Sequence, residues 1–178
     1  MKHLAGSLML GALLTVGSCS NRGKAPEVSD NIHSSLEQAG IKDVSVHEDR
    51  DKGVVTLKGT VPSDAEKARA EWIAKAQAAG EVVANEIAVV PPGNESAAKT
   101  VNSDIDKAID KNLDAALVQN RLNKAVKYSV KNGLVTLTGR VDSQAARSEA
   151  AHIAASVPNV AQVVNEVEVR HNRATSSR

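Results

Sequence analysis

Few side chains in this 178-residue sequence are of a type and spacing that could carry out chemistry. Cys19 is the one cysteine, so no intramolecular disulfide can form, and its thiol is a nucleophile that could accept a lipid group. The five histidines lack metal-ligand spacing. No Ser-His-Asp set or carboxylate pair recurs, and no glycine loop opens a helix to hold a phosphate. We therefore predict no catalytic residues, no metal site and no cofactor.

Cys19 stands at the end of a segment with the features of an export signal. A short basic start is followed by an apolar run over residues 4–16, which is too short to cross a bilayer core of about 30 Å. Val16-Gly17-Ser18 then precede the cysteine, and this arrangement resembles the bacterial lipobox, whose cysteine is diacylated and becomes the mature N-terminus. We expect residues 1–18 to be a lipoprotein signal peptide and Cys19 to carry lipid. The alternative is an ordinary signal peptide with an incidental cysteine.

The residues after Cys19 indicate where the exported protein goes. Residues 19–26 are polar and are expected to form a tether between the lipid and the first domain. By resemblance to enterobacterial lipoproteins, the absence of Asp at Ser20 implies sorting to the outer membrane, facing the periplasm. A soluble periplasmic protein is the alternative.

The charge balance argues against partners that need a strong basic field. The formal net charge of the full chain is +1, so we predict no nucleic-acid partner. Residues 19–99 contain 10 Lys and Arg against 13 Asp and Glu, a net −3, whereas residues 100–178 contain 11 against 8, a net +3. This difference is either scatter between two solvated surfaces or a sign that the second half faces an anionic partner.

An internal repeat determines the predicted architecture. The segment GVVTLKGTV over residues 53–61 recurs as GLVTLTGRV over residues 133–141, and the match continues in the same register to Asn85 and Asn165. Upstream the register slips by about two residues, because the first copy has the longer turn before this segment. Duplication of one unit explains the pattern.

Each copy begins with a helix that is followed by a hairpin. Helical spacing of apolar residues predicts the first helix through Ile32 and Leu36 in copy one. In copy two it predicts a helix that starts at Ser103-Asp104 and buries Ile105 and Ile109. Strands follow on both sides of a turn, which in copy two is Asn132-Gly133, a strong hairpin signal.

Each copy ends with a second helix and a last strand, expected at 82–89 and at 160–169. We therefore predict an α+β fold of two small tandem α-β-β-α-β domains, each a mixed three-stranded sheet with two helices on one face. The expected boundaries are a first domain over 27–91, a linker over 92–100, a second domain over 101–171 and a tail over 172–178.

The repeated pattern resembles the BON domain, a family named after bacterial osmotically inducible and nodulation-associated proteins. Both copies carry two glycines, a leucine and an asparagine at the family's spacing, namely Gly53/Gly133, Gly59/Gly139, Leu57/Leu137 and Asn85/Asn165. Two such copies behind a lipobox are similar to the dual-BON outer-membrane lipoproteins. That resemblance implies phospholipid binding and a role in maintaining the integrity of the cell envelope.

The glycines and a tryptophan have different expected roles. Gly53, Gly59, Gly133 and Gly139 are expected to be structural, because turns and close backbone approach account for them. Trp72 is predicted to point away from the core, on a helix face that it shares with alanines. An outward indole suits docking against the other domain, a partner or a membrane interface. The alternative is an isolated exposed aromatic.

Cations in and after the first helix of the second copy are the candidate phospholipid contacts, because the resemblance implies that this helix contacts lipid. These candidates are Lys107, Lys111, Arg121, Lys124 and Lys127. Each charge near an anionic surface contributes about 1 kcal/mol, so several together matter. Aspartates alternate with the lysines along the helix, so a solvated face of mixed charge is the alternative.

We therefore predict a lipid-anchored envelope protein that binds phospholipid surfaces, most readily anionic ones, and supports envelope integrity. The alternative is a protein-interaction adaptor for outer-membrane or peptidoglycan-associated assembly, with the Trp72 face as its docking patch. No enzymatic activity is predicted.

Overall fold

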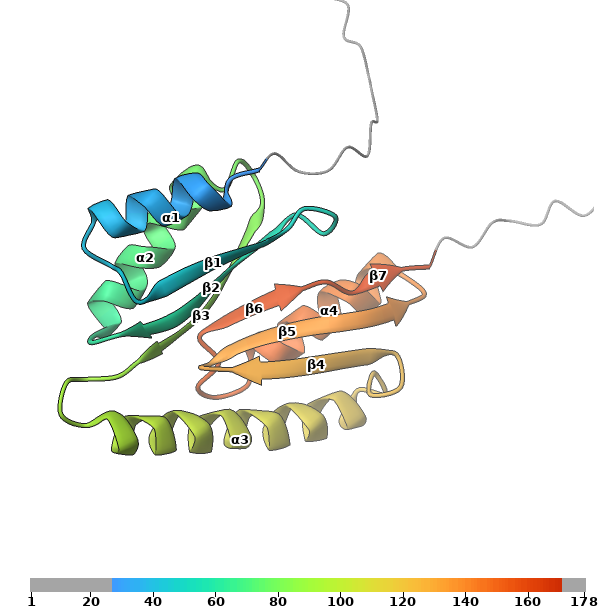
Figure 1. Ribbon diagram of the computed structural model, residues 1–178. Helices are drawn as coiled ribbons and strands as arrows, with labels where there is room; N and C mark the ends of the chain where they lie inside the picture. Colours follow the sequence, from blue (N-terminus) through green and yellow to red (C-terminus); the bar gives the residue numbers. More distant parts are fainter. Residues whose placement is uncertain (1–26, 171–178) are drawn as a thin grey trace, which may run out of the picture.

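The computed structural model describes residues 27–170, so Cys19, the predicted signal peptide and the predicted tail lie outside the described residues. Two consecutive α-β-β-α-β units follow one another along the chain (Figure 1). The first unit contains α1 (Ser29–Gln38), β1 (Val44–Asp49), β2 (Val54–Val61), α2 (Asp64–Gln77) and β3 (Val82–Val89). The second contains α3 (Glu95–Gln119), β4 (Val126–Lys131), β5 (Leu134–Val141), α4 (Gln144–Ala155), β6 (Gln162–Asn165) and β7 (Glu168–Val169). The predicted fold class is confirmed.

Both sheets are mixed and share one pairing scheme. β1 is antiparallel to β2, and β3 lies parallel on the other side of β2, after a crossover through α2. In the second unit, β4 is antiparallel to β5, whereas β6 and β7 are parallel to it. Val44 pairs with Gly59 and Val126 pairs with Gly139, so the two copies slip by two residues across the first turn.

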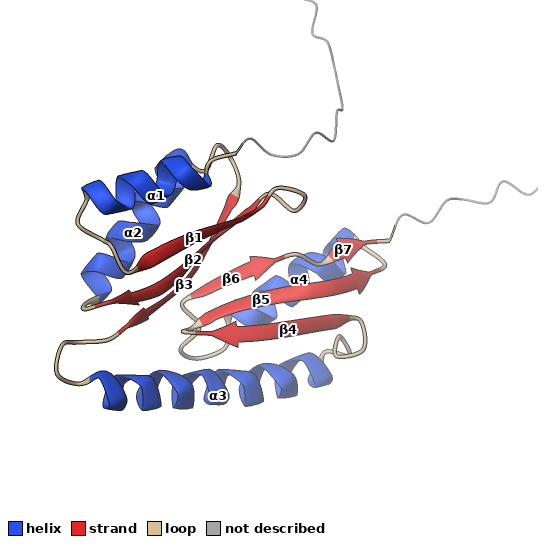
Figure 2. Ribbon diagram, in the orientation of Figure 1, coloured by secondary structure: helices blue, strands red, loops and turns tan. Residues whose placement is uncertain are grey.

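Each unit has its own apolar core between one face of its sheet and its two helices (Figure 2). The cores bury alternate residues of the central strand, Val55 and Leu57 in one unit and Val135 and Leu137 in the other. The helices contribute fully buried apolar side chains and small alanines, namely Ile32, Leu36, Ala70, Ala74, Ile109, Leu113, Leu117, Ala150 and Ala154. The alanines let the second helix of each unit lie close to the sheet.

An asparagine occupies the same position in both copies of the repeat, at the last strand, and hydrogen-bonds to the second helix. Asn85 is 3% exposed, and its side-chain amide donates to the Lys67 carbonyl and to the Glu71 carboxylate. The Asn165 amide likewise donates to the carbonyl of Arg147 at 2.9 Å. Both asparagines therefore have a structural role.

The first helix of the second unit is longer than expected. α3 begins at Glu95, not at Ser103-Asp104, so residues 95–100 of the predicted linker are helical. The Glu95 carboxylate accepts a hydrogen bond from the Gly93 N–H at 2.9 Å, and backbone hydrogen bonds lower its pKa. A negative charge at this position also interacts favourably with the helix dipole. Ile105, expected in the core, lies on this extension and is 36% exposed.

The last strand of the second unit is interrupted, in contrast to the continuous strand expected over 160–169. β6 ends at Asn165 and β7 begins at Glu168. The Arg147 guanidinium donates to the carbonyls of both Asn165 and Val167, at 3.0 and 2.8 Å. In a regular strand these carbonyls stand almost 7 Å apart, at about 3.3 Å per residue, so one guanidinium can bridge them only where the strand bends.

The continuous strand of the first unit supports this explanation. Lys67 is the counterpart of Arg147, and its ammonium lacks the planar fork of donors with which the guanidinium holds both carbonyls. It donates instead across the domain boundary, to the carbonyl of Asn132 at 3.1 Å. β3 pairs with β2 without interruption.

The two units meet through the outer faces of their sheets. Val54 and Ala84 form a small buried cluster with Leu134 and Val164, which are their counterparts in the repeat. The polar contacts between the units also join counterpart residues, so equivalent surfaces of the two units face each other. Lys52 pairs with Glu166 at 2.8 Å, and the residues at the counterpart positions, Asn132 and Glu86, are joined by an amide–carbonyl hydrogen bond at 2.7 Å. The contact therefore has approximate two-fold symmetry.

One side chain breaks this symmetry and covers an open sheet edge. Gln162 Nε2 donates to the Val83 carbonyl at 2.6 Å, and its Oε1 accepts a hydrogen bond from the Asn85 N–H at 3.0 Å. The side-chain amide thereby satisfies backbone groups at the edge of β3, as a neighbouring strand would.

Candidate functional site

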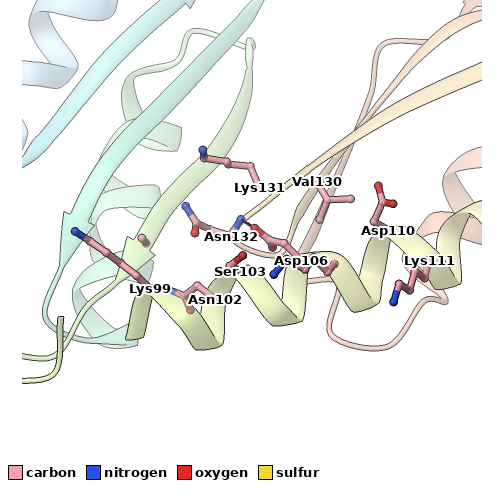
Figure 3. A pocket seen from close by; sticks show the side chains of 11 residues that line it. Lys99, Asn102, Ser103, Asp106, Asp110, Lys111, Val130, Lys131 and Asn132 are labelled. Carbon is pink, nitrogen blue, oxygen red and sulfur yellow. Dashed lines mark hydrogen bonds between the residues drawn. The ribbon is translucent and has the colours of Figure 1, made fainter. Parts of the chain in front are cut away.

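A groove of about 500 Å³ lies beside the N-terminal half of α3, where the two units meet. One wall is α3, the opposite wall is the end of β4 with the turn at Asn132, and Ala88 of β3 contributes from the first unit. Figure 3 shows polar side chains entering this space from both walls. This groove is the candidate functional site.

The helix brings its groove residues together by simple periodicity. Lys99, Ser103, Lys107 and Lys111 follow at intervals of four residues, so they form one row along the flank of α3. The neighbouring face of the helix is packed against the sheet by Ile109 and the apolar residues after it. Packing of the buried face therefore fixes the direction in which the row faces.

The groove is lined by more positive than negative groups. Four lysines, Lys99, Lys107, Lys111 and Lys131, are present with two aspartates, so the formal balance of the lining is +2. Lys107 is paired with Asp104 at 3.1 Å, but both side chains are about two-thirds exposed and such pairs are weak. Within the described part of the chain, the other three lysines have no carboxylate at ion-pair distance.

Asp106 holds the far wall of the groove in place. Its carboxylate accepts hydrogen bonds from the N–H groups of Asn132 and Gly133, at 2.8 and 2.9 Å. Asn132 in turn donates to the Glu86 carbonyl of the first unit. Lys67 donates to the Asn132 carbonyl, and its burial lowers the pKa of its ammonium. The shape of the groove is thus linked to the contact between the two units.

The five cations predicted from the sequence fall into two groups. Lys107 and Lys111 lie together in the groove. Arg121, Lys124 and Lys127 follow the other end of α3, where Lys127 borders a smaller hollow of about 170 Å³. Arg121 has a φ of +59° two residues after the end of α3, and Gly40 has a φ of +84° at the same place after α1. Its position therefore also terminates a helix.

The sequence prediction missed two groove lysines. Lys99 was placed in the linker, although its spacing from Lys107 continues the helical row. Lys131 precedes the Asn132-Gly133 turn, and only the fold brings this turn opposite α3. The spacing of Lys99 is a signal in the sequence, whereas the position of Lys131 is a consequence of tertiary structure.

Two of the four predicted structural glycines leave no room for a side chain. Gly59 has a φ of +140°, and a Cβ there would overlap the carbonyl oxygen of Asp43. Gly139 has a φ of +117°, and a Cβ there would overlap the carbonyl oxygen of Ala125. These glycines let the strand cross closely over the loop before β1 or β4, away from the groove.

Trp72 lies on the first unit, outside the groove. Its side chain is 72% exposed on α2. Exposed alanines flank it on the same helix, at Ala65, Ala68 and Ala76. The direction predicted for this side chain thus agrees with its exposure, whereas its role as an interface stays a prediction.

Residues 27–170 hold no cluster of three His, Cys, Asp or Glu side chains suited to a metal ion. None of the helices in this region combines the length and apolar character needed to cross a membrane. Lipid on Cys19 stays a prediction.

Comparison with known proteins agrees with the repeat and the fold. The family model described as the BON domain matches residues 25–91 and again residues 103–171. The chain belongs to the BON domain family. The second match begins at residue 103, so Lys99 lies between the two BON domains, on the helical extension. BON proteins are typically periplasmic or envelope-associated, and the family is known for phospholipid binding or envelope-related interactions, generally without catalysis.

Individual proteins show how similar this chain is to known sequences and structures. This BON protein is 35% identical over 124 residues to an Anaplasma centrale protein described as an uncharacterized protein in the gshII 5′ region, covering 68% of this chain and 80% of that protein. Two structures of CdsD, a structural protein of the type III secretion system of Chlamydia trachomatis, align with a TM-score of 0.32 and 17% identity. The alignments cover 81% and 80% of this chain, and 66% and 62% of those chains.

Proposed function

We propose that this protein binds anionic phospholipid surfaces through the groove and the exposed face of α3, and so supports envelope integrity. The observation that carries the proposal is the excess of lysines in a groove of about 500 Å³. Each lysine near an anionic surface contributes about 1 kcal/mol, so the four together give a reversible but useful attraction.

Exposed apolar side chains on the same helix support a contact with lipid. Val101 is 55% exposed and Ile105 is 36% exposed, both on the extension of α3 that also carries Lys99 and Lys107. A helix that combines basic and apolar residues can lie at the boundary between head groups and acyl chains. The pair lies on another side of α3 from the row of lysines, so its contact with lipid would be separate from that of the groove.

A lipid on Cys19 would act together with this surface. The polar segment before α1 would hold both domains close to the outer membrane, on its periplasmic side. At the high local concentration that a short tether produces, even a weak contact by α3 is occupied. Recognition by the groove and attachment through Cys19 are separate parts of the proposal and need separate tests.

Sedimentation with vesicles tests the groove. Residues 20–178, which include every described residue, should bind vesicles that contain phosphatidylglycerol, and should lose binding as salt screens the charges. The double variant Lys107→Gln/Lys111→Gln should bind about 30-fold more weakly, since it loses about 2 kcal/mol. Lys42→Gln, which removes an exposed lysine of the first domain, is the matched control. Equal binding by the double variant would contradict the proposal.

Membrane fractionation tests the anchor. The wild-type chain is expected in the outer-membrane fraction with an intact mass that includes acyl chains, and Cys19→Ala is expected to lose both. A mature wild-type mass without acyl chains would contradict lipid attachment at Cys19, but it would not contradict lipid binding by the groove.

A protein-interaction adaptor is the second candidate, favoured by the 72% exposure of Trp72. In that account α2 of the first domain docks an envelope-assembly protein. The two candidates differ in one comparison, because Trp72→Ala should leave vesicle binding unchanged but abolish association with an envelope partner isolated by cross-linking. Lost vesicle binding in Trp72→Ala would instead assign this side chain to the lipid contact.

A further inference from the structure

A second pocket, of about 350 Å³, lies at the domain boundary beside the break between β6 and β7. Its lining includes Lys52, Val82, Arg147 and residues 164–168, and we call it the boundary pocket. The approximate two-fold symmetry of the domain contact relates it to the space between the end of β3 and the turn before β5. In that counterpart space lies the N-terminal half of α3. The described part of the first unit has no such helical segment, since α1 begins at residue 29.

The N-terminal half of α3 satisfies backbone groups in the counterpart space. The Asp106 carboxylate accepts a hydrogen bond from the Gly133 N–H at 2.9 Å, and the Asn102 amide donates to the Val89 carbonyl at 3.2 Å. Ile105 lies between these two contacts in the sequence and lines the same space. An acid, a carboxamide and an aliphatic side chain on one helix therefore fill this place.

The equivalent backbone groups around the boundary pocket are open. Gln162 covers the edge of β3, but its repeat counterpart is Val82, which cannot form such hydrogen bonds and is 49% exposed. Four counterpart groups have no hydrogen-bond partner among the described residues, namely the N–H groups of Gly53 and Asn165 and the carbonyls of Val163 and Val169. The second unit thus closes one of two equivalent places and leaves the other accessible.

The charges of the boundary pocket leave one cation able to receive an acid. All three acidic side chains that line the pocket already have partners. Arg147 has no carboxylate at ion-pair distance within residues 27–170, and its guanidinium has more N–H donors than its two carbonyl contacts use. Burial lowers the pKa of its counterpart Lys67, and the charge of Asp106 is one of those that oppose this shift. An acid therefore lies near the equivalent cation in the filled space.

We propose that the boundary pocket docks a helix of a partner protein with the same chemistry as the N-terminal half of α3. Such a helix carries an asparagine, an aliphatic residue three positions later, and then an acid. The acid would contact Arg147 and the Gly53 N–H, the carboxamide would contact the Val169 carbonyl, and the aliphatic side chain would cover Val167. This surface is separate from the α3 groove and from the Trp72 face, so the inference goes beyond the proposed function.

A peptide with the sequence of residues 95–110 is the probe, because it carries all three side chains at the required spacing. Residues 20–178 should bind it saturably, with the largest changes in backbone amide NMR signals at Gly53, Asn165 and Val169. The same peptide with asparagine in place of its aspartate at position 106 should bind about tenfold more weakly, since it loses a charge-assisted contact.

Val82→Gln is the most informative variant of the protein, because it introduces the residue that the second unit has at the counterpart position. The added carboxamide should cover the open groups of β6 and weaken peptide binding about tenfold. Val118→Gln is the matched control, since Val118 is 50% exposed at the other end of α3, and it should bind the peptide as the wild type does.

Three results would overturn the inference. The first is the absence of saturable binding up to about 1 mM peptide. The second is that the largest changes occur at Asn132 and Gly133, which would show that the peptide displaces the α3 segment of the protein itself. The third is unchanged binding by Val82→Gln with an otherwise unaltered amide spectrum, which would place the peptide outside the boundary pocket. None of these results would contradict lipid binding by the groove.

Discussion

The two domains have the same core but begin in different ways, and this difference creates the groove. In the first domain, the Glu48 carboxylate accepts hydrogen bonds from the N–H groups of Val28 and Ser29, at 2.9 and 3.0 Å, and so closes the start of α1. The strand pairing places Val130 at the position of Glu48 in the second domain. The Val130 side chain cannot accept a hydrogen bond, and the helix there continues toward the first domain.

The extension of α3 carries most of the groove on the helix side. Leu36 and Leu117 occupy the same place, since each accepts a backbone hydrogen bond from the residue five positions later, Ile41 or Leu122. By this alignment Val28, the residue before α1, corresponds to Ile109, so residues 95–108 of α3 extend beyond the start of the corresponding helix of the first unit. Duplication kept the core, and the extension between the copies added the surface that we assign to function.

The largest expected effect tests the shared core. Gly59→Ala and Gly139→Ala should each destabilise its own domain by about 3 kcal/mol or more, because the added Cβ overlaps a carbonyl oxygen. Thermal unfolding followed by calorimetry measures both. Gly53→Ala is the control, since it keeps a φ of +65° but has open space at the Cβ, and should cost only about 1 kcal/mol. A small effect at only one of the two tight positions would show that the cores are not equivalent.

The second-largest expected effect is a loss of the free energy that couples the two domains. Gln162→Ala removes two hydrogen bonds to the edge of β3 and should weaken the coupling of the domains by about 1–2 kcal/mol. Denaturant unfolding, observed through Trp72 in the first domain and Tyr128 in the second, should change from one transition to two. Gln119→Ala, at the exposed end of α3, should leave the transitions coincident. Coincident transitions in Gln162→Ala would contradict a role for this side chain in coupling.

The smallest expected effect is a pH dependence of the stability of the first domain. Burial, reinforced by the charge of Glu48 and opposed by Arg50, raises the pKa of Glu81 above its ordinary value. Among the described residues, neither carboxylate oxygen of Glu81 has a hydrogen-bond partner. The folded state therefore holds the proton more tightly than the unfolded state. The contribution of Glu81 to stability is greatest below the ordinary pKa of 4.5 and is lost as pH rises through the raised value.

Glu81→Gln tests this dependence. It should raise the free energy of unfolding at neutral pH by less than about 1 kcal/mol, because the desolvated carboxylate is replaced by a neutral amide and solvent screens much of the effect. The gain should shrink as pH falls toward 4.5 and below, where Glu81 becomes protonated as well. Glu149→Gln, an exposed change on α4, should show no such trend in denaturant unfolding measured across pH. A gain in Glu81→Gln that does not change with pH would contradict the assignment.

The sequence predicted the repeated fold because its signals are local and occur twice. The strand pattern around Gly59 and Gly139, and the turn at Asn132-Gly133, report on backbone geometry within a few residues. The start of α3 was misplaced because residues 95–100 are helical without an apolar period, and the break after Asn165 depends on the distant Arg147. The groove was predicted only in part, since Lys107 and Lys111 share a helix, whereas Lys131 reaches it through tertiary structure.

The central claim is that the groove, and not the Trp72 face, contacts anionic lipid. The most direct test is to follow the backbone amide signals of residues 20–178 by NMR during titration with phosphatidylglycerol bicelles, with phosphatidylcholine bicelles as the control. We predict that the largest changes are at Lys107, Lys111 and Asn132, and that they are absent with phosphatidylcholine. Changes confined to α2 around Trp72, or equal changes with both lipids, would contradict the account.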